Sequence, residues 1–274
     1  MLDPIDYKEP ACALCEGKDF YYPDKDAPKG TIPVRSVLEK IDKAEWKNDM
    51  AEAGRLLEYW VNEGVQLGDK RGLLTLYSEQ MGYYRKIRDE EKGLRSVENG
   101  LALLQELDLS DSISGATIML NAATTMKAFG KASSAAPLYD EVEKIYTKYL
   151  NKKDDRWAGL YNNSALTFAD LCEYDRAKES YFKALDVLKE NENTENEVAI
   201  TYVNLAHLFE TTDQEEKSYE YMEKALEVLN SDTVTRDGKY ANTCDKCAGS
   251  FGYFGYFLAE EELRKRAKEI YERA

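Results

Sequence analysis

The stretch DDRWAGLYNNSALTFADLCEYDRAKESYFKALDVL, residues 154–188, predicts two helices joined by a short turn. Small side chains stand where the two helices must approach closely: Ala165 on the first helix, and Ala177 and Ala184 on the second. Aromatic side chains at helical spacing are expected to fill the space between the helices. A unit this short cannot bury its apolar face alone, so we expect the rest of the chain to supply copies that stack on it.

The same pattern recurs along the chain at nearly constant spacing. Aligning the helix pairs brings one position of each first helix into register: Ile41, Met81, Ala123, Ala165, Ala206 and Ala248. The steps between them are 40, 42, 42, 41 and 42 residues, a regularity not expected of an unrepeated chain. The second helices carry small residues in the same register: Ala53, Gly93, Ala135 and Ala177, then Ala184, Ala225 and Ala267 one turn later. Such residues let helices pack at the short end of the usual spacing of about 8–10 Å.

The ends of this array are less regular than its middle. The first helix is predicted at residues 34–46, and the last pair at residues 240–257 and 260–273. In the last pair Glu260 stands where a small residue is usual, so an alignment shifted by one helical turn, with Gly255 as the small residue, competes. Residues 1–30 hold four of the six prolines and no helical period, which indicates an extended, irregular leader.

Composition limits the classes of partner. The formal net charge is −15, from 52 acidic and 37 basic side chains, and a field of that sign repels nucleic acid and anionic membrane surfaces. No apolar run approaches the ~20 residues that span a bilayer, and the acidic opening lacks the apolar core of a secretory signal. We therefore expect a cytoplasmic protein with no nucleic-acid or membrane partner, whose cysteines are thiols or metal ligands.

The small residues and aromatics, with Asn-Ala-Ala at 121–123, Asn-Ser-Ala at 163–165 and Asn-Leu-Ala at 204–206, resemble tetratricopeptide repeats. The length of ~42 residues is similar to the kinesin-light-chain type. The resemblance implies an all-α fold: a right-handed α-solenoid of about six tetratricopeptide hairpins over residues 31–274, preceded by the irregular extension at 1–30. Repeats one and two depart from the family because they lack the alanine of the first helix.

In that family the first helices line a concave groove, and the residue two before the aligned alanine points into it. The resemblance thus implies a peptide-binding groove with Asn121, Asn163 and Asn204 as a ladder of amides, since an amide both donates and accepts. Neighbouring candidates for the same surface are Glu79, Asn162, Lys127, His207 and Lys246. The alternative is that each Asn bonds the adjacent repeat and fixes the stacking. His207, the only histidine, is assigned no chemical role.

Two Cys-x-x-Cys pairs, Cys12 with Cys15 and Cys244 with Cys247, have the spacing of zinc ligands. The segment between Cys15 and the first helix extends at most ~60 Å, about the length of six repeats, so the pairs could meet. A structural zinc site is therefore one expectation, and no cofactor is otherwise required. The alternative is that Cys244 and Cys247 only pack and that Cys12 and Cys15 are idle; Cys172 is expected to be such a packing residue. The two pairs also resemble an uncharacterised group of bacterial tetratricopeptide proteins.

The function that these features predict is a non-catalytic scaffold that holds an extended protein or peptide segment in the groove. One alternative is a peptide-sensing regulator that acts through a protein partner, because the chain lacks a helix-turn-helix segment and a basic patch. Another is self-association, in which the leader fills a groove. No phosphate loop, nucleophile elbow or comparable catalytic motif is present, so we do not expect an enzyme.

Overall fold

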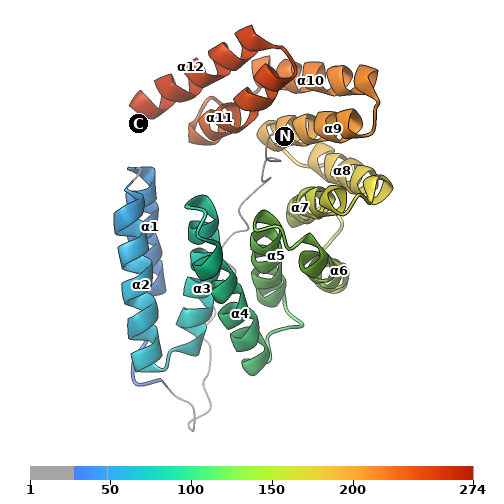
Figure 1. The fold of residues 1–274 in the computed structure, drawn as a ribbon. Helices are drawn as coiled ribbons and strands as arrows, with labels where there is room; N and C mark the ends of the chain where they lie inside the picture. The colour runs from blue at the N-terminus through green and yellow to red at the C-terminus, as the bar shows by residue number, and fades with distance from the viewer. Residues whose placement is uncertain (1–27, 48, 274) are drawn as a thin grey trace. The chain divides into compact units, whose positions relative to one another are not determined.

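The computed structural model describes residues 28–47 and 49–273, and within these ranges the chain forms twelve α-helices and no strand (Figure 1). Consecutive helices pack in pairs as antiparallel hairpins. The first three hairpins are α1 (Val34–Trp46) with α2 (Met50–Leu67), α3 (Lys70–Lys86) with α4 (Glu90–Glu106), and α5 (Ile113–Ala128) with α6 (Ala132–Tyr149). The other three are α7 (Arg156–Asp170) with α8 (Tyr174–Lys189), α9 (Glu195–Thr211) with α10 (Glu215–Asn230), and α11 (Gly238–Tyr253) with α12 (Phe257–Arg273).

The described residues fall into two compact units of three hairpins each, divided between Leu150 and Asn151. We call residues 28–150 the N-terminal unit and residues 151–273 the C-terminal unit. Within each unit the first helices pack on one another from hairpin to hairpin, as α3 does on α5 and α9 on α11. The second helix of a hairpin also packs on the first helix of the next, as α4 does on α5 and α8 on α9.

The aligned positions of the sequence lie in the core of each hairpin, as predicted. Ile41, Met81, Ala123, Ala165, Ala206 and Ala248 are all buried, and so are the small residues of the second helices. Without a larger side chain at the crossing, the two helices of a hairpin approach closely and aromatic rings such as Tyr139 and Tyr181 fill the space beside them. Each segment of about 42 residues therefore forms one hairpin with its own buried contacts.

The helices end at well-defined local features. In the N-terminal unit the side chains of Asp49, Asp69, Asp89 and Ser112 each cap a helix by accepting a backbone N–H three residues later. Several helices end in a residue with positive φ, among them Gly68 and Gly130. Such caps satisfy backbone groups that the helix itself leaves without partners.

The last hairpin corrects one prediction. The helix expected over residues 240–257 ends at Tyr253, and Gly255, with a φ of 83°, lies in the turn before α12. Few residues other than glycine adopt this backbone conformation, which explains the break inside an aromatic-rich stretch. Ala248 is fully buried in α11, so the register that aligns Ala248 is the correct one and the shifted register based on Gly255 is wrong.

The predicted leader, residues 1–30, lies almost entirely outside the described residues. The first described residues, from residue 28 on, contact the first hairpin: the Lys29 N–H donates to the Leu67 carbonyl at 2.8 Å. The Ile32 N–H then donates to the buried carboxylate of Asp69 at 2.7 Å. The packed part of the N-terminal unit therefore starts slightly before its first helix.

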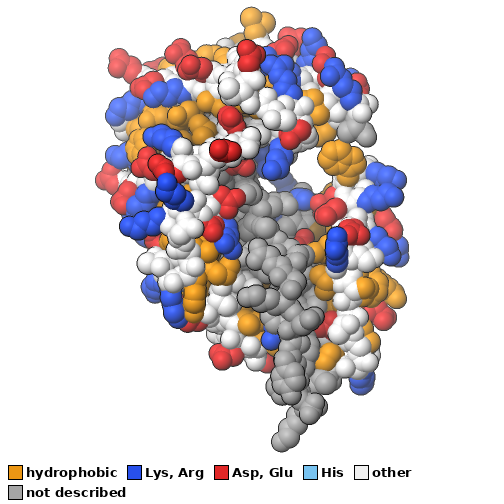
Figure 2. All heavy atoms as spheres, turned by 180° about the vertical axis from the view of Figure 1, so that it is seen from behind, with side chains coloured by type: hydrophobic (Ala, Val, Ile, Leu, Met, Phe, Trp, Pro, Cys, Tyr) orange, Lys and Arg blue, Asp and Glu red, His pale blue; other side chains and the backbone are white. Residues whose placement is uncertain are grey.

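Acidic and basic side chains alternate over the face that Figure 2 shows, with orange apolar side chains between them. Many ion pairs of the described residues join side chains three or four positions apart on one helix, such as Arg55 with Glu52 and Arg95 with Glu91. Exposed pairs of this kind add little stability. Among the described helices, none is long and apolar enough to cross a membrane.

Candidate functional site: the polar face of the first helices

In the N-terminal unit, the predicted groove residue Asn121 bonds the neighbouring hairpin. Its side chain on α5 is buried, and Nδ2 donates to Oγ of Ser78 on α3 at 2.6 Å. Ser78 lies 43 residues earlier, about one repeat. For this asparagine, the contact that the structure describes is the one that the stacking alternative predicted.

Further polar contacts join the same two helices. Oγ1 of Thr125 on α5 donates to the Met81 carbonyl on α3 at 3.4 Å, and the Arg85 guanidinium approaches the same hydroxyl at 3.4 Å. The predicted site residues Glu79, half-buried on α3, and Lys127, buried on α5, belong to these two helices. A line of bonds spaced by one repeat therefore connects consecutive hairpins.

In the C-terminal unit, Asn162 rather than Asn163 makes the bond between hairpins. Asn162 on α7 is fully buried, and its Oδ1 accepts from Oγ1 of Thr201 on α9 at 3.1 Å. Its Nδ2 donates to the Ala158 carbonyl of its own helix at 3.1 Å. Both polar atoms of this amide are thus satisfied inside the protein.

Asn163 differs from Asn162, although the two are adjacent in sequence. Its side chain is only 2% exposed, and neither Oδ1 nor Nδ2 has a hydrogen-bond partner within the part of the chain that the structure describes. A buried polar group without a partner costs about 1–3 kcal/mol, so such groups are rare in folded proteins. The third predicted amide, Asn204, is buried on α9. Asn163 is therefore a member of the predicted ladder whose amide has capacity left for a ligand.

His207 connects the last two hairpins. Nε2 lies 2.9 Å from Oγ of Ser250 on α11, and the ring packs on those of Tyr253 and Phe254 at centroid distances of 5.6 and 5.0 Å. Burial lowers the pKa of His207 below its usual range, and the negative charge of Glu210 opposes that shift. The imidazole is thus a neutral packing group between hairpins. Lys246, also predicted for the groove, lies half-buried on α11.

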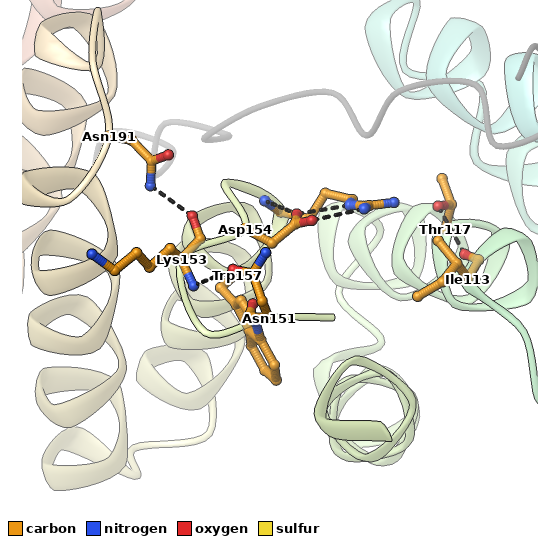
Figure 3. Close-up of polar contacts among 8 residues, drawn as sticks. Ile113, Thr117, Asn151, Lys153, Asp154, Trp157 and Asn191 are labelled. Atoms are coloured by element: carbon orange, nitrogen blue, oxygen red, sulfur yellow. Dashed lines mark hydrogen bonds and ion pairs between the residues drawn. The ribbon is translucent and has the colours of Figure 1, made fainter. Parts of the chain in front are cut away.

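In the C-terminal unit, hydrogen bonds also join the loop before α7 to the loop after α8, at the open end of one hairpin (Figure 3). Nδ2 of Asn191, after α8, donates to the Lys153 carbonyl at 2.9 Å, and the Lys153 N–H donates to Oδ1 of Asn151 at 2.8 Å. Nε1 of Trp157 then donates to the Asn151 carbonyl at 2.9 Å. These bonds fix the entry of α7, the helix that carries Asn162 and Asn163.

The cysteines of the last hairpin are sealed in the core. Cys244 and Cys247 on α11 are fully buried, and burial raises the pKa of both thiols, which keeps them protonated. Cys12 and Cys15 lie outside the described residues, so the proposed zinc site of four thiols stays a prediction. Within the described ranges no three potential metal ligands cluster. Cys172 is exposed in the turn after α7, at a φ of 60°, so the expectation that it packs in the core is wrong.

Three residues that complete these contacts were not anticipated: Ser78, Thr201 and Ser250. Each lies 39 to 43 residues from its partner, close to the repeat length. A search for polar pairs separated by one repeat would have found them. The sequence thus contained a signal for the bonds between hairpins, but residue type alone does not distinguish such a pair from a binding residue.

Solved structures with the same arrangement of hairpins identify the fold. The putative kinesin light chain of Podosopora anserina with nearly identical TPR-like repeats aligns with a TM-score of 0.52 at 15% identity, covering 71% of this chain and 92% of the other. A variant of that same protein aligns with a TM-score of 0.53 over the same shares and at the same identity. BtubC (BKLC) from P. vanneervenii has 22% identity and a TM-score of 0.47, covering 87% of this chain and 91% of the other. The first two likenesses confirm the predicted all-α tetratricopeptide fold.

Comparison by sequence gives the family. No curated protein matches this sequence. A family model matches residues 133–270, a stretch that runs from α6 into α12 and includes Asn162, Asn163, Asn204 and the Cys244 pair. These residues are just over half of the 274 in the chain. The chain therefore belongs to the family described as "Uncharacterized protein conserved in bacteria (DUF2225)".

Proposed function

We propose that this protein is a non-catalytic scaffold that holds an extended segment of a protein or peptide. The segment would lie against the face of the first helices to which Asn121, Asn163 and Asn204 belong. Tetratricopeptide-type repeats serve generally as protein-interaction scaffolds, because stacked hairpins offer a long continuous surface. The observation that carries the proposal is the buried amide of Asn163, which lacks hydrogen-bond partners among the described residues.

An extended backbone offers what this amide lacks. Each residue of a β-like peptide presents one N–H and one carbonyl, and an asparagine side chain bonds both at once. A ligand gains most at a polar atom that is already shielded from water and unpaired, because its desolvation cost has been met by folding. Asn162 has no such capacity, because Oδ1 accepts from Thr201 and Nδ2 donates to the Ala158 carbonyl, and Nδ2 of Asn121 already donates to Ser78.

The test uses the full chain and a peptide selected for it from a displayed library of unstructured peptides. We expect Asn163→Ala to weaken binding of the selected peptide about tenfold, the loss of one or two buried hydrogen bonds. Asn99→Ala is the matched control, because Asn99 is exposed on α4, a second helix, and its substitution should leave the affinity unchanged.

Two outcomes reject the proposal: equal affinity of the wild type and the Asn163→Ala variant, or a library that yields no peptide. Light scattering on the full chain and on a chain without residues 1–30 tests the alternative of self-association. Loss of an oligomer on truncation would favour that alternative. A regulator acting through a protein partner would bind that partner differently with and without the selected peptide.

A further inference from the structure

A cavity of about 580 Å³ lies in the C-terminal unit, between the turn from α9 into α10 and the end of α11. Its lining residues are Glu210, Asp213, Glu215, Ser218, Tyr219, Tyr253 and Phe254. None of them was predicted as a site residue, and Asn163 is not among them. The size is within the range of ligand pockets, large enough for one long side chain and the backbone beside it.

Aromatic rings form part of the wall of this cavity. Tyr253 and Phe254 pack edge to face, at a centroid distance of 5.2 Å and an angle of 88°. Tyr219 stands against Phe254 at 6.2 Å and 75°. Phe254 is buried beneath them, whereas Tyr219 and Tyr253 are 40% and 48% exposed. Two aromatic side chains therefore stand at an accessible mouth, with a third at their base.

The remaining wall is acidic. Glu210, Asp213 and Glu215 contribute carboxylates, no lysine or arginine lines the cavity, and the described residues give these three carboxylates no ion pair. Lys217, the nearest base along α10, donates to Gln214 Oε1 at 2.8 Å and lies 5.2 Å from the centre of the Phe209 ring. Glu210 is held in place by the Tyr253 hydroxyl, which donates to Oε1 at 2.5 Å. The cavity thus combines π faces with carboxylates that no ion pair neutralises in the part of the chain that the structure describes.

We propose that this cavity binds a cationic side chain, arginine or lysine, of a protein partner. A cation over a tyrosine face is attracted by the ring quadrupole, and adjacent carboxylates add charge-assisted hydrogen bonds. Arginine fits better than lysine, because its planar guanidinium both stacks on a ring and bonds a carboxylate with two N–H groups. An anionic group is repelled, and a neutral apolar group leaves three carboxylates to be desolvated without compensation. This site stands independently of the function proposed above.

The direct test adds small probes to the intact chain and measures binding by saturation-transfer NMR. The probe is N-acetyl-arginine methylamide, and its matched control is the citrulline analogue, which has almost the same shape without the charge. We expect the arginine probe to bind about tenfold more tightly than the citrulline probe, with an affinity that falls as salt is added. Equal binding of the two probes overturns the proposal, and so does tighter binding of the free polyamine spermidine, which would assign the cavity to small amines.

Variants localise the effect. Tyr219→Leu removes an accessible ring and Glu215→Gln removes one carboxylate; each should weaken the arginine probe several-fold while the circular-dichroism melting curve stays unchanged. Glu216→Gln is the matched control, because Glu216 is the next residue on α10, is exposed and does not line the cavity. If Glu216→Gln weakens binding as much as Glu215→Gln, the attraction is only that of the overall charge and the site is rejected.

Discussion

The first helices α5 and α7 occupy equivalent places in the repeat, 42 residues apart. They differ in how the first turn of each helix accommodates the backbone carbonyl that precedes it. Before α5, the Leu109 carbonyl lies so close to Gly115 that any added Cβ would collide with its oxygen. Before α7, the equivalent carbonyl belongs to Asn151, and Trp157, in the register of Gly115, donates its indole N–H to it. The Leu109 carbonyl accepts instead from the Ser112 hydroxyl at 2.6 Å. Both carbonyls are therefore bonded, one by a serine hydroxyl beside a glycine and the other by an indole N–H.

The middle of the same two helices differs in the same manner. Asn121 and Asn163 are equivalent positions, but Asn121 bonds Ser78, whereas Asn163 leaves the bond between hairpins to its neighbour Asn162. The comparison teaches that a repeat alignment predicts where a residue lies and how deeply it is buried. The partner of its polar atoms depends on which residue the adjacent hairpin presents there.

The largest expected effect is at the entry of α5. Gly115→Ala forces a Cβ against a backbone carbonyl that cannot rotate away, so we expect the free energy of unfolding to fall by about 1–3 kcal/mol. Gly82→Ala is the control, because nothing lies within 4 Å of an added Cβ on this α3 residue. That change should stabilise the protein by about 0.5–1 kcal/mol. Urea denaturation measures both, and a neutral Gly115→Ala variant would contradict the close approach.

The same substitution at the two equivalent asparagines should have opposite signs. Asn121→Leu removes the donor to Ser78 and leaves that buried hydroxyl with one partner fewer, so stability should fall by about 1 kcal/mol. Asn163→Leu removes two polar atoms that lack partners among the described residues, so stability should rise by about 1 kcal/mol. Paired urea titrations give the difference, and a fall of the same size in both variants would remove the distinction between the two sites.

Trp157→Phe tests the other solution at the helix entry. Phenylalanine keeps an aromatic ring beside Tyr161, on which the indole stacks at 5.5 Å, but leaves the Asn151 carbonyl without its indole donor. We expect a loss of about 1 kcal/mol from the hydrogen bond alone. Trp46→Phe is the matched control: Trp46 is 63% exposed, and its replacement should change the thermal midpoint very little.

The smallest expected effect is a difference between the two units in how their stability depends on pH. His207 has a lowered pKa when folded, so on acidification the unfolded chain takes up a proton first, and stability is lost as pH falls below the usual histidine value of 6.5. The bond of Asn121 to Ser78 in the N-terminal unit does not titrate there. Hydrogen exchange at about pH 5.5 and 7.5 should therefore show α9 and α11 loosening more than α3 and α5. His207→Gln should abolish the difference; if the difference persists, other groups cause it.

Much of the fold could be predicted from the sequence, because packing between helices constrains residue size at fixed intervals. The predicted helix at residues 34–46 matches α1, and the aligned alanines are buried as expected. The break at Gly255 was missed, because aromatic residues on both sides continue a helical pattern and only the backbone conformation shows the turn. Cys172 was misjudged for a related reason, since a residue at the end of an apolar helix face can already belong to the exposed turn.

The candidate site was less predictable than the fold. Asn121, Asn163 and Asn204 look alike in the sequence, and all three are buried. An asparagine with remaining hydrogen-bonding capacity, such as Asn163, can be recognised only when its neighbours are known in space. The cavity beside Tyr219 and Tyr253 could not be foreseen either, because it draws residues from three helices and from the turn between two of them.

The bonds described between hairpins have a mechanical consequence. Within each unit, the side-chain bonds that cross from one hairpin to another join adjacent hairpins, as Asn121 with Ser78 and His207 with Ser250 do. Under tension applied across one unit, these bonds connect only neighbouring hairpins, so its hairpins should yield one after another from an end. Each that opens releases about 42 residues, roughly 140 Å of contour length. The end-to-end length of such a unit is therefore expected to increase in steps, while the hairpins that have not yet opened stay folded.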